Sequence, residues 1–450
     1  IFGADRYETS VKIAEKLGSV DKMALATGSD FPDALSISEI ASSMGMPILL
    51  TEKNALPDKV RSYIVSAGIT ESYVIGGNGV ISDSVKNALP NAIRLGGKDR
   101  YETNVAVMNQ FVDKLNFNKI YVAVGDGKAG DGFADALTGA ALAAKDSSPL
   151  ILAYKVLPKV TADFLKPKVF AQSQVYALGG EAVVPSSILD TIASYISQGL
   201  KGKVLSQAGV YGPQEGTETI AQNVIIAVRD VTLQNTIIEG DLIITEGVGD
   251  GDVTLKNVTV NGTTTIRGGG TNSVVMYNFK GKTVVVDVPD GRSVRLVAQG
   301  DTSVESLSMN SDGKLEESEL TGNGFTDVVI PEGAEVILKG SFNTVDIKAD
   351  NANVSVESGS INSLNISKGV AGAKVDIAKN AKVANLTANA PVKVSGEGTV
   401  HTANIKSAGV ELAKEPDKTN IDKGITAKID GKDMDEDDVE TPPAGGGGGG

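Results

Sequence analysis

The seven residues GADRYET at positions 3–9 return as GKDRYET at positions 97–103, 94 residues further along the chain. Apolar residues at helical spacing follow each copy, over 9–17 and 103–115. Self-similarity at a fixed separation is the signature of a repeated structural unit. The first part of the chain is therefore expected to hold two copies of one module.

Further matches follow in the same order in both copies. They are ALATG at 24–28 with YVAVG at 121–125, FPDAL at 31–35 with FADAL at 133–137, PILL at 47–50 with PLIL at 149–152, and YVIGG at 73–77 with YALGG at 176–180. Short apolar runs at 23–26, 47–50 and 73–75 are typical of buried parallel strands, and the segments 33–44, 57–67 and 82–89 have helical spacing. We expect two small parallel α/β sandwich modules, over residues 1–95 and 96–198.

Ligands of parallel α/β folds bind beyond the carboxyl ends of the strands. The candidate binding residues at these ends or in the repeated motif are Arg6, Asp33, Gly76, Gly77, Arg94, Lys98, Arg100, Asp135, Gly179 and Gly180. Each Gly-Gly pair either holds an anion on free backbone N–H groups or only makes a tight turn. The motif either caps a helix and joins two modules by ion pairs, or supplies an Arg for phosphate or carboxylate groups of a polymer. Neither Gly-Gly turn is followed by the Lys-Ser/Thr of a P-loop or carries the GxGxxG fingerprint, which disfavours nucleotide binding there.

A second repeat, with a period of about 22 residues, begins after residue 216. It shows as VTLQN at 231–235, VTLKN at 253–257 and VVMYN at 274–278, and later as FNTVDI at 342–347, INSLNI at 361–366, VANL at 383–386 and VHTANI at 400–405. One coil of a parallel β-helix has such a period, with Asn side chains stacked at the turns. The fold class is therefore α/β followed by all-β: a linker at 199–216, a right-handed parallel β-helix at 217–412, and an acidic, Gly-rich tail at 413–450.

Composition excludes several kinds of function. The 450 residues carry a net charge of −14 and include no Cys, no Trp and one His. No disulfide framework, Cys-based zinc site or thiol nucleophile is possible, and a Ser-His-Asp triad would depend on His401 alone. The acidic balance disfavours nucleic acid, no apolar run is long enough to span a membrane, and we expect no cofactor.

Two features of the second repeat are weighed for chemistry. Glu246, Asp250 and Asp252 share one Gly-rich turn and could bind Ca²⁺, although a solvated acidic turn between coils is the simpler interpretation. His401 occupies the repeat position of Asn343, Asn362 and Ala384, which favours a surface or turn residue over a catalytic one. We therefore expect no metal site and no catalytic group in the β-helix.

The segments GADRYETSVKIAEKL, ATGSDFPDALS, PILLT and YVIGGNGVIS resemble the cell wall binding repeat type 2 of clostridial and related Gram-positive surface proteins, over residues 1–198. The resemblance implies an exported protein held non-covalently on the wall by an anionic, teichoic-acid-like secondary polymer. It also implies three repeats in a pseudo-threefold unit, whereas this chain shows two. We expect an upstream segment with a signal peptide; either this segment also holds a third repeat, or the chain is unusual in having two. An acidic protein can bind an anionic polymer if its basic residues gather locally, as Arg6, Arg94, Lys98 and Arg100 do.

The leading hypothesis is a non-catalytic, extracellular cell-surface protein, anchored by residues 1–198 and extended by a β-solenoid spacer or adhesive region. The first alternative is a wall-anchored polysaccharide lyase or hydrolase with its site on the β-helix. A second alternative is a cytosolic α/β domain that binds a small molecule.

Overall fold

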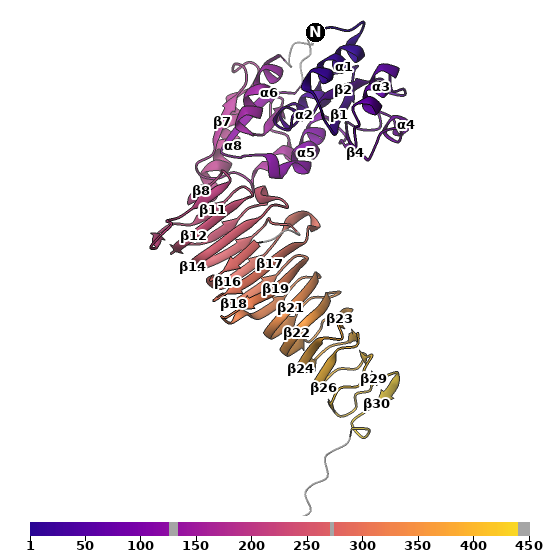
Figure 1. The fold of residues 1–450 in the computed structure, drawn as a ribbon, viewed down its shortest axis with the longest axis vertical. Coiled ribbons are helices and arrows are strands. Elements are labelled where there is room, and N and C mark those ends of the chain that lie inside the picture. Colours follow the sequence, from indigo (N-terminus) through magenta and orange to yellow (C-terminus); the bar gives the residue numbers. More distant parts are fainter. Residues whose placement is uncertain (126–133, 271–273, 440–450) are drawn as a thin grey trace, which may run out of the picture. The chain divides into compact units, whose positions relative to one another are not determined.

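The computed structural model describes residues 1–125, 134–270 and 274–439. They form two compact units, which divide the chain between Lys201 and Gly202 (Figure 1). We call them the α/β unit and the solenoid. Within these ranges, none of the helices combines the length and the apolar character that crossing a bilayer requires.

The first module of the α/β unit is a four-stranded parallel sheet in the order β2-β1-β3-β4. Its elements are α1 (Arg6–Leu17), β1 (Lys22–Thr27), α2 (Pro32–Ser43), β2 (Ile48–Thr51), α3 (Asp58–Ser66), β3 (Glu71–Ile75), α4 (Asp83–Lys86) and β4 (Ala92–Leu95). The expected strands and helices are confirmed, and only α4 is clearly shorter than predicted. The apolar runs lie inside because helices cover the sheet, as the buried β1 residues Met23 and Leu25 show.

The second module repeats this plan with a three-stranded parallel sheet, β6-β5-β7. Its elements are α5 (Arg100–Gln110), the 3₁₀ turn η1 (Val112–Lys114), β5 (Lys119–Val124), α6 (Ala134–Asp146), β6 (Leu150–Ala153), α7 (Lys159–Leu165), β7 (Gln174–Ala177) and α8 (Ser186–Gln198). Helix α2 of the first module packs against α5 and α6 of the second. Leu35 of α2 shares a core cluster with Ala136 and Ala140 of α6, so the two modules are joined by buried apolar surface.

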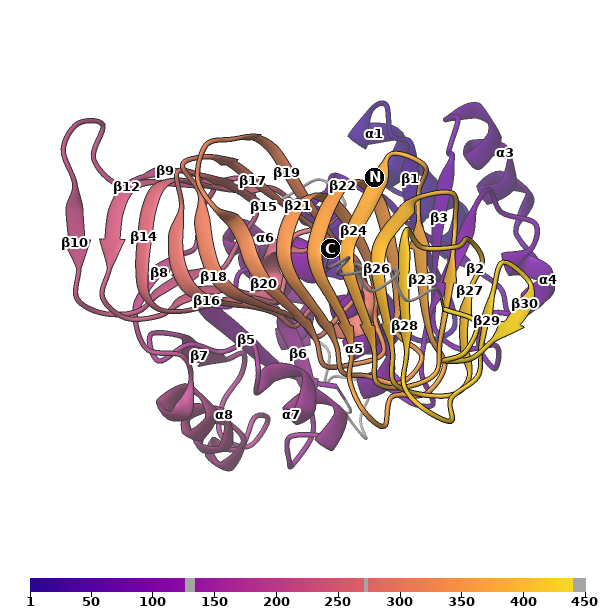
Figure 2. The same cartoon turned by 90° about the horizontal axis from the view of Figure 1, so that it is seen from below.

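The solenoid is a stack of parallel coils, closed by the antiparallel pair β29–β30 (Figure 2). Its strands are β8 (Lys203–Leu205), β9 (Gly209–Tyr211), β10 (Glu218–Ile220), β11 (Val224–Ile226), β12 (Val231–Ile238), β13 (Leu242–Ile244), β14 (Val253–Ile266), β15 (Val274–Tyr277), β16 (Lys280–Val286), β17 (Val294–Gly300), β18 (Ser303–Met309), β19 (Gly313–Leu320), β20 (Gly324–Ile330), β21 (Glu335–Ile347), β22 (Asn353–Ile366), β23 (Ala373–Ile377), β24 (Ala381–Ala388), β25 (Val392–Ser395), β26 (Thr399–Ile405), β27 (Val410–Leu412), β28 (Lys418–Ile421), β29 (Ala427–Ile429) and β30 (Lys432–Met434). Two 3₁₀ turns, η2 (Glu246–Val248) and η3 (Pro289–Gly291), interrupt them. The predicted parallel β-helix is confirmed.

Strand register confirms the period read from the sequence. Val231 pairs with Val253, and Val253 pairs with Val274 in the next coil. In the later coils the inward column runs through Phe342, Ile361, Val383 and Val400. These columns are buried and mostly aliphatic, because identical positions of stacked coils face the same narrow interior.

A ladder of asparagines marks one corner of the first coils. Asn235, Asn257 and Asn278 have φ values of 50°, 54° and 52°, in the left-handed region that Asn tolerates. The side-chain N–H of Asn257 donates to Asn235 Oδ1, and that of Asn278 donates to Asn257 Oδ1, both at 2.8 Å. The predicted stacking of Asn at turns is thereby confirmed.

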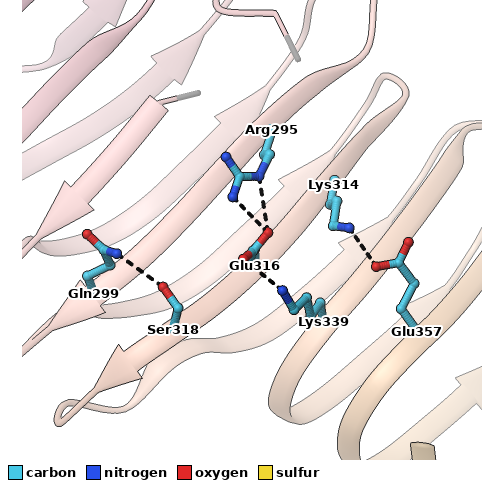
Figure 3. A network of polar contacts seen from close by, with 7 residues as sticks. All are labelled: Arg295, Gln299, Lys314, Glu316, Ser318, Lys339 and Glu357. Carbon is cyan, nitrogen blue, oxygen red and sulfur yellow. Dashed lines mark hydrogen bonds and ion pairs between the residues drawn. The ribbon is translucent and has the colours of Figure 1, made fainter. Parts of the chain in front are cut away.

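Charged side chains link neighbouring coils on the outer surface (Figure 3). Glu316 Oε2 accepts from Arg295 Nη2 at 2.9 Å, and Glu316 Oε1 accepts from Lys339 Nζ at 3.0 Å. Burial alone would raise the pKa of Glu316, but the hydrogen bonds from Lys339 and Arg295 outweigh burial and hold that pKa below its usual value. The network thus stacks opposite charges across three successive strands, β17, β19 and β21.

The solenoid extends beyond its expected limits at both ends. Strands β8 and β9 lie in the segment expected to be a linker, 199–216, and β28 to β30 lie in the expected tail, 413–450. These strands are three or four residues long, which is too short to show a clear alternation of apolar and polar residues. They form because the adjacent coil offers a ready row of backbone partners, as between Val224 and Lys203.

Candidate functional site

The repeated motif begins a helix in both modules. Asp5 is the N-cap of α1 and accepts from the backbone N–H of Glu8 at 2.7 Å, while Glu8 Oε2 accepts from the N–H of Ala4 at 2.7 Å. Asp99 and Glu102 repeat this reciprocal capping box in α5. The helices therefore start at Arg6 and Arg100, earlier than the expected 9 and 103, because these caps satisfy the first N–H groups.

The motif arginines hold the ends of the first strand of each module. Arg6 Nη1 donates to the carbonyl of Gly28, just past β1, and Arg100 Nη1 donates to the carbonyl of Gly125, just past β5. A Cβ at Gly28 would lie 2.6 Å from the Tyr7 ring. Glycine is required there because the strand end runs directly against the motif.

Each Gly-Gly turn packs on the aspartate of the neighbouring helix. Gly76 and Gly179 have φ values of 107° and 110°, and a Cβ there would lie 2.3 Å from Asp33 Oδ2 and 2.5 Å from Asp135 Oδ2. Both glycines form tight turns at positive φ values, which favour glycine. The same contact also brings a carboxyl group to the turn.

Asp33 is the perturbed carboxyl group of this site. Burial, with the nearby charge of Asp30, raises its pKa to about 6, although the charge of Arg100 opposes the shift. Asp33 belongs to the first module and Arg100 to the second. The electrostatics of Asp33 therefore depend on both modules.

Arg94 is occupied within its own module. Its guanidinium donates to the carbonyls of Gly76 and Ile81, both at 2.8 Å, and to Asp83 Oδ1 at 3.1 Å. One acceptor belongs to the Gly76–Gly77 turn, and the other two lie in the segment that follows it. In this structure Arg94 holds the turn in place.

A hollow of about 260 Å³ lies where the two modules meet. It brings together Asp33 and Gly77 of the first module with Lys98 and Arg100 of the second. The ammonium group of Lys98 makes no hydrogen bond or ion pair with any described residue. Four of the residues that the sequence predicted thus lie together in this hollow, which we call the junction hollow.

Other predicted residues lie elsewhere. Arg6, Gly76, Arg94, Asp135, Gly179 and Gly180 do not line the junction hollow. Residues that do line it but that the sequence did not single out are Thr27, Asp30, Pro32, Gly79, Val80, Gly97, Asp99 and Thr103. The sequence feature that could have identified these residues is the match between the two copies, because it places them beside strand ends or in the repeated motif. Only the packing of one copy on the other showed which ends face each other.

Equivalent helix faces of the two modules are covered differently. Phe111, the C-cap residue of α5, is buried and packs edge-on against Tyr73 of the first module, with ring centroids 4.9 Å apart. Its equivalent in α1, Leu17, is 49% exposed, as is Ile13. The face that α5 uses to contact the preceding module is thus uncovered on α1.

The complementary faces show the same asymmetry. Leu35 and Ile40 of α2 are buried, and α2 packs against the second module. Their equivalents in α6, Leu137 and Leu142, are 57% and 46% exposed. The two modules therefore pack head to tail through one contact. The equivalent apolar faces that this contact does not use, on α1 of the first module and on α6 of the second, are exposed.

Two of the three carboxylates in the acidic turn weighed as a calcium site are engaged by arginines. Glu246 is buried and accepts from Arg267 Nη2 at 3.1 Å, and Asp250 lies 3.9 Å from Arg292 Nη1. Among the described residues, no group of three or more His, Asp and Glu side chains could hold a metal ion. His401 lies on the solenoid surface, in register with the positions predicted for it, and its Nδ1 lies 2.9 Å from Asp417 Oδ2.

Comparison with known proteins bears on the α/β unit. Residues 1–86 and 94–189 match the family described as cell wall binding domain 2 (CWB2). The chain is 36% identical over 152 residues to the N-acetylmuramoyl-L-alanine amidase LytC of Bacillus subtilis, and 37% identical over 154 residues to the amidase enhancer of the same organism. Each match covers 34% of this chain, and 29% and 20% of those proteins.

Two solved structures are also similar. Cwp6 from Clostridium difficile shares 31% identity with a TM-score of 0.38, covering 43% of this chain and 31% of its own. Cwp8 from Clostridium difficile shares 29% identity with a TM-score of 0.39, covering 43% of this chain and 33% of its own. The family match makes the protein an extracellular one of the cell wall or surface. Residues 1–189, which carry the duplicated motif and the junction hollow, are a pair of cell wall binding domain 2 repeats.

Proposed function

We propose that this protein is a non-catalytic surface protein that the α/β unit anchors to the wall by binding an anionic secondary wall polymer in the junction hollow. One observation carries the proposal: the hollow joins Lys98 and Arg100 of one repeat to the strand ends of the other. Because the ammonium group of Lys98 has no partner among the described residues, it is available to a phosphate or carboxylate.

Acidic side chains in the hollow make this binding depend on pH. Asp30, Asp33 and Asp99 line it beside the two basic residues. Asp99 is engaged as a helix cap, and the raised pKa of Asp33, about 6, makes its charge easy to neutralise. Binding of an anion is therefore expected to strengthen as the pH falls through that value.

A third repeat would complete the anchor. The exposed apolar residues on α1 and α6 are equivalent to those that the two repeats bury against each other. A third copy of the same repeat fits both faces, since it would carry both halves of the contact. The solenoid then serves as a spacer or an adhesive surface.

Sedimentation of the full chain with purified cell walls tests the proposal. Walls that keep their secondary polymer should retain the protein, and walls stripped of it should not. Lys98→Ala should weaken retention about tenfold, the loss expected for one charge-assisted contact. Lys16→Ala, which changes an exposed lysine outside the hollow, is the matched control and should bind normally. Equal retention by stripped walls would refute the polymer as ligand.

A further inference from the structure

The outer surface of the solenoid contains a second hollow, of about 570 Å³, well separated in sequence from the repeats. Its lining comes from four neighbouring strands of the stack, β21, β22, β24 and β26, and from Asp417, the residue before β28. These strands lie side by side in Figures 1 and 2. Because neighbouring strands are about 4.8 Å apart, the hollow runs along the stacking direction for several coils.

One small residue opens this hollow. The register aligns Asn343, Asn362, Ala384, His401 and Asp417 in one outward column. Asn362 Nδ2 donates to Asn343 Oδ1 at 3.2 Å, and His401 Nδ1 lies 2.9 Å from Asp417 Oδ2. The methyl group of Ala384 lies between these two linked pairs. The row of side-chain contacts along this column is therefore interrupted over one coil.

The lining combines a small apolar floor with a polar rim. Ile361 and Val383 are buried beneath the hollow. The rim offers the hydroxyl groups of Ser360 and Thr399 and the ammonium group of Lys382, besides the column of amide, imidazole and carboxylate groups. Lys382 makes no hydrogen bond or ion pair with any described residue. The hollow thus has donors, acceptors and one unneutralised positive charge around an apolar base.

We propose that this hollow binds a linear glycan bearing an acidic group, with its chain along the stacking direction. Sugar rings present hydroxyl groups at their edges and C–H groups on their faces, which match the rim and the floor. The acidic group of the glycan binds beside Lys382, because the ammonium group of this residue attracts a negative charge. A protein partner fits less well, because from Lys280 onward no described large apolar side chain is exposed and interfaces are built around such anchors.

This site is independent of the junction hollow and extends the protein's function beyond anchoring. His401 is the single histidine of the sequence, so its imidazole resonances report on the hollow without assignment of other residues. The full chain is titrated with hexamers of galacturonate, mannuronate and hyaluronan, each added to about 10 mM oligomer. Sugar-phosphate oligomers are titrated separately. A saturable shift of the His401 resonances is expected with at least one acidic oligomer. The responding arm identifies carboxylate or phosphate as the acidic group.

Two variants follow the register and should keep the fold. Ala384→Asn places in the hollow the residue that the two preceding coils carry, and should weaken binding about tenfold or more by filling the floor. Lys382→Ser copies Ser360 of the preceding coil, and should weaken binding of the acid oligomer while sparing its neutral methyl ester. Lys98→Ala should leave the titration unchanged, which separates this proposal from wall anchoring. A panel without any saturable shift, or binding undiminished in Ala384→Asn, would overturn it.

Discussion

Glu39 should make the α/β unit less stable as the pH rises. It lies in α2, and burial raises its pKa to about 8 from an ordinary 4.5. The backbone N–H groups of Glu39, Ile40 and Leu150 lower this pKa only in part, because neither carboxylate oxygen has a partner within hydrogen-bond distance among the described residues. The folded state thus holds the neutral acid, whereas the unfolded chain ionises above pH 4.5.

The size of the effect follows from proton linkage. The pKa of Glu39 is higher in the folded state, about 8, than in the unfolded chain, about 4.5. The resulting loss in the free energy of unfolding is absent below the unfolded pKa and grows until the pH reaches the folded pKa. Each unit is worth about 1.4 kcal/mol, so ionisation in the unfolded state favours unfolding by about 3 kcal/mol at pH 7. Glu39→Gln removes the ionisation and keeps the shape. It should be nearly neutral at about pH 4 and stabilising by roughly 3 kcal/mol at pH 7.

Urea unfolding, followed by circular dichroism at the helical minimum, measures this difference. The described α-helices all belong to the α/β unit, so the helical signal reports on that unit. Glu15→Gln, at an exposed position of α1, is the matched control and should show no such dependence on pH. A difference between Glu39→Gln and the parent that stays constant from about pH 5 to pH 8 would refute the reasoning.

Three other predictions concern the wall site and the solenoid. Retention on polymer-bearing walls should rise as the pH falls from about 7.5 to about 5, because Asp33 loses its charge near pH 6; Asp33→Asn should bind with little pH dependence. Asn257→Ala breaks two hydrogen bonds of the Asn ladder at a φ of 54° and should cost about 2 to 3 kcal/mol in thermal unfolding, whereas Asn257→Gly should cost less because glycine tolerates this φ. Phe325→Ala empties a fully buried position of the solenoid and should cost about 3 to 5 kcal/mol; a loss under about 1 kcal/mol would contradict the packing described.

Much of the fold followed from repetition in the sequence. The duplicated motif and the matching apolar runs predicted both α/β modules, since buried parallel strands have a strong apolar signal. The period of the second half predicted which residues stack, and the observed pairs Val231–Val253 and Val253–Val274 confirm it. Strands β8, β9 and β28 to β30 escaped prediction, because short edge strands are formed by a neighbour's backbone and not by their own pattern.

The candidate site was only partly predictable. The sequence named Asp33, Gly77, Lys98 and Arg100 from strand ends and charge, and these four residues share the junction hollow. It also named Arg94, whose guanidinium instead holds the Gly76–Gly77 turn. Charge in a sequence shows that a group is available, but the hydrogen bonds that occupy it depend on which carbonyls the fold brings within reach.

The sequence by itself determined the modules, the coil period and the identity of the side chains in each column, because periodic burial leaves a periodic pattern. Only the tertiary structure decided that the Glu39 carboxyl group is buried with no hydrogen-bond partner among the described residues, and that one repeat's motif meets the other's strand ends. It also decided that Ala384 opens a hollow between Asn362 and His401. Each of these depends on contacts between residues far apart in the chain. Such contacts are set by how surfaces pack, and a local pattern of apolar and polar residues does not encode them.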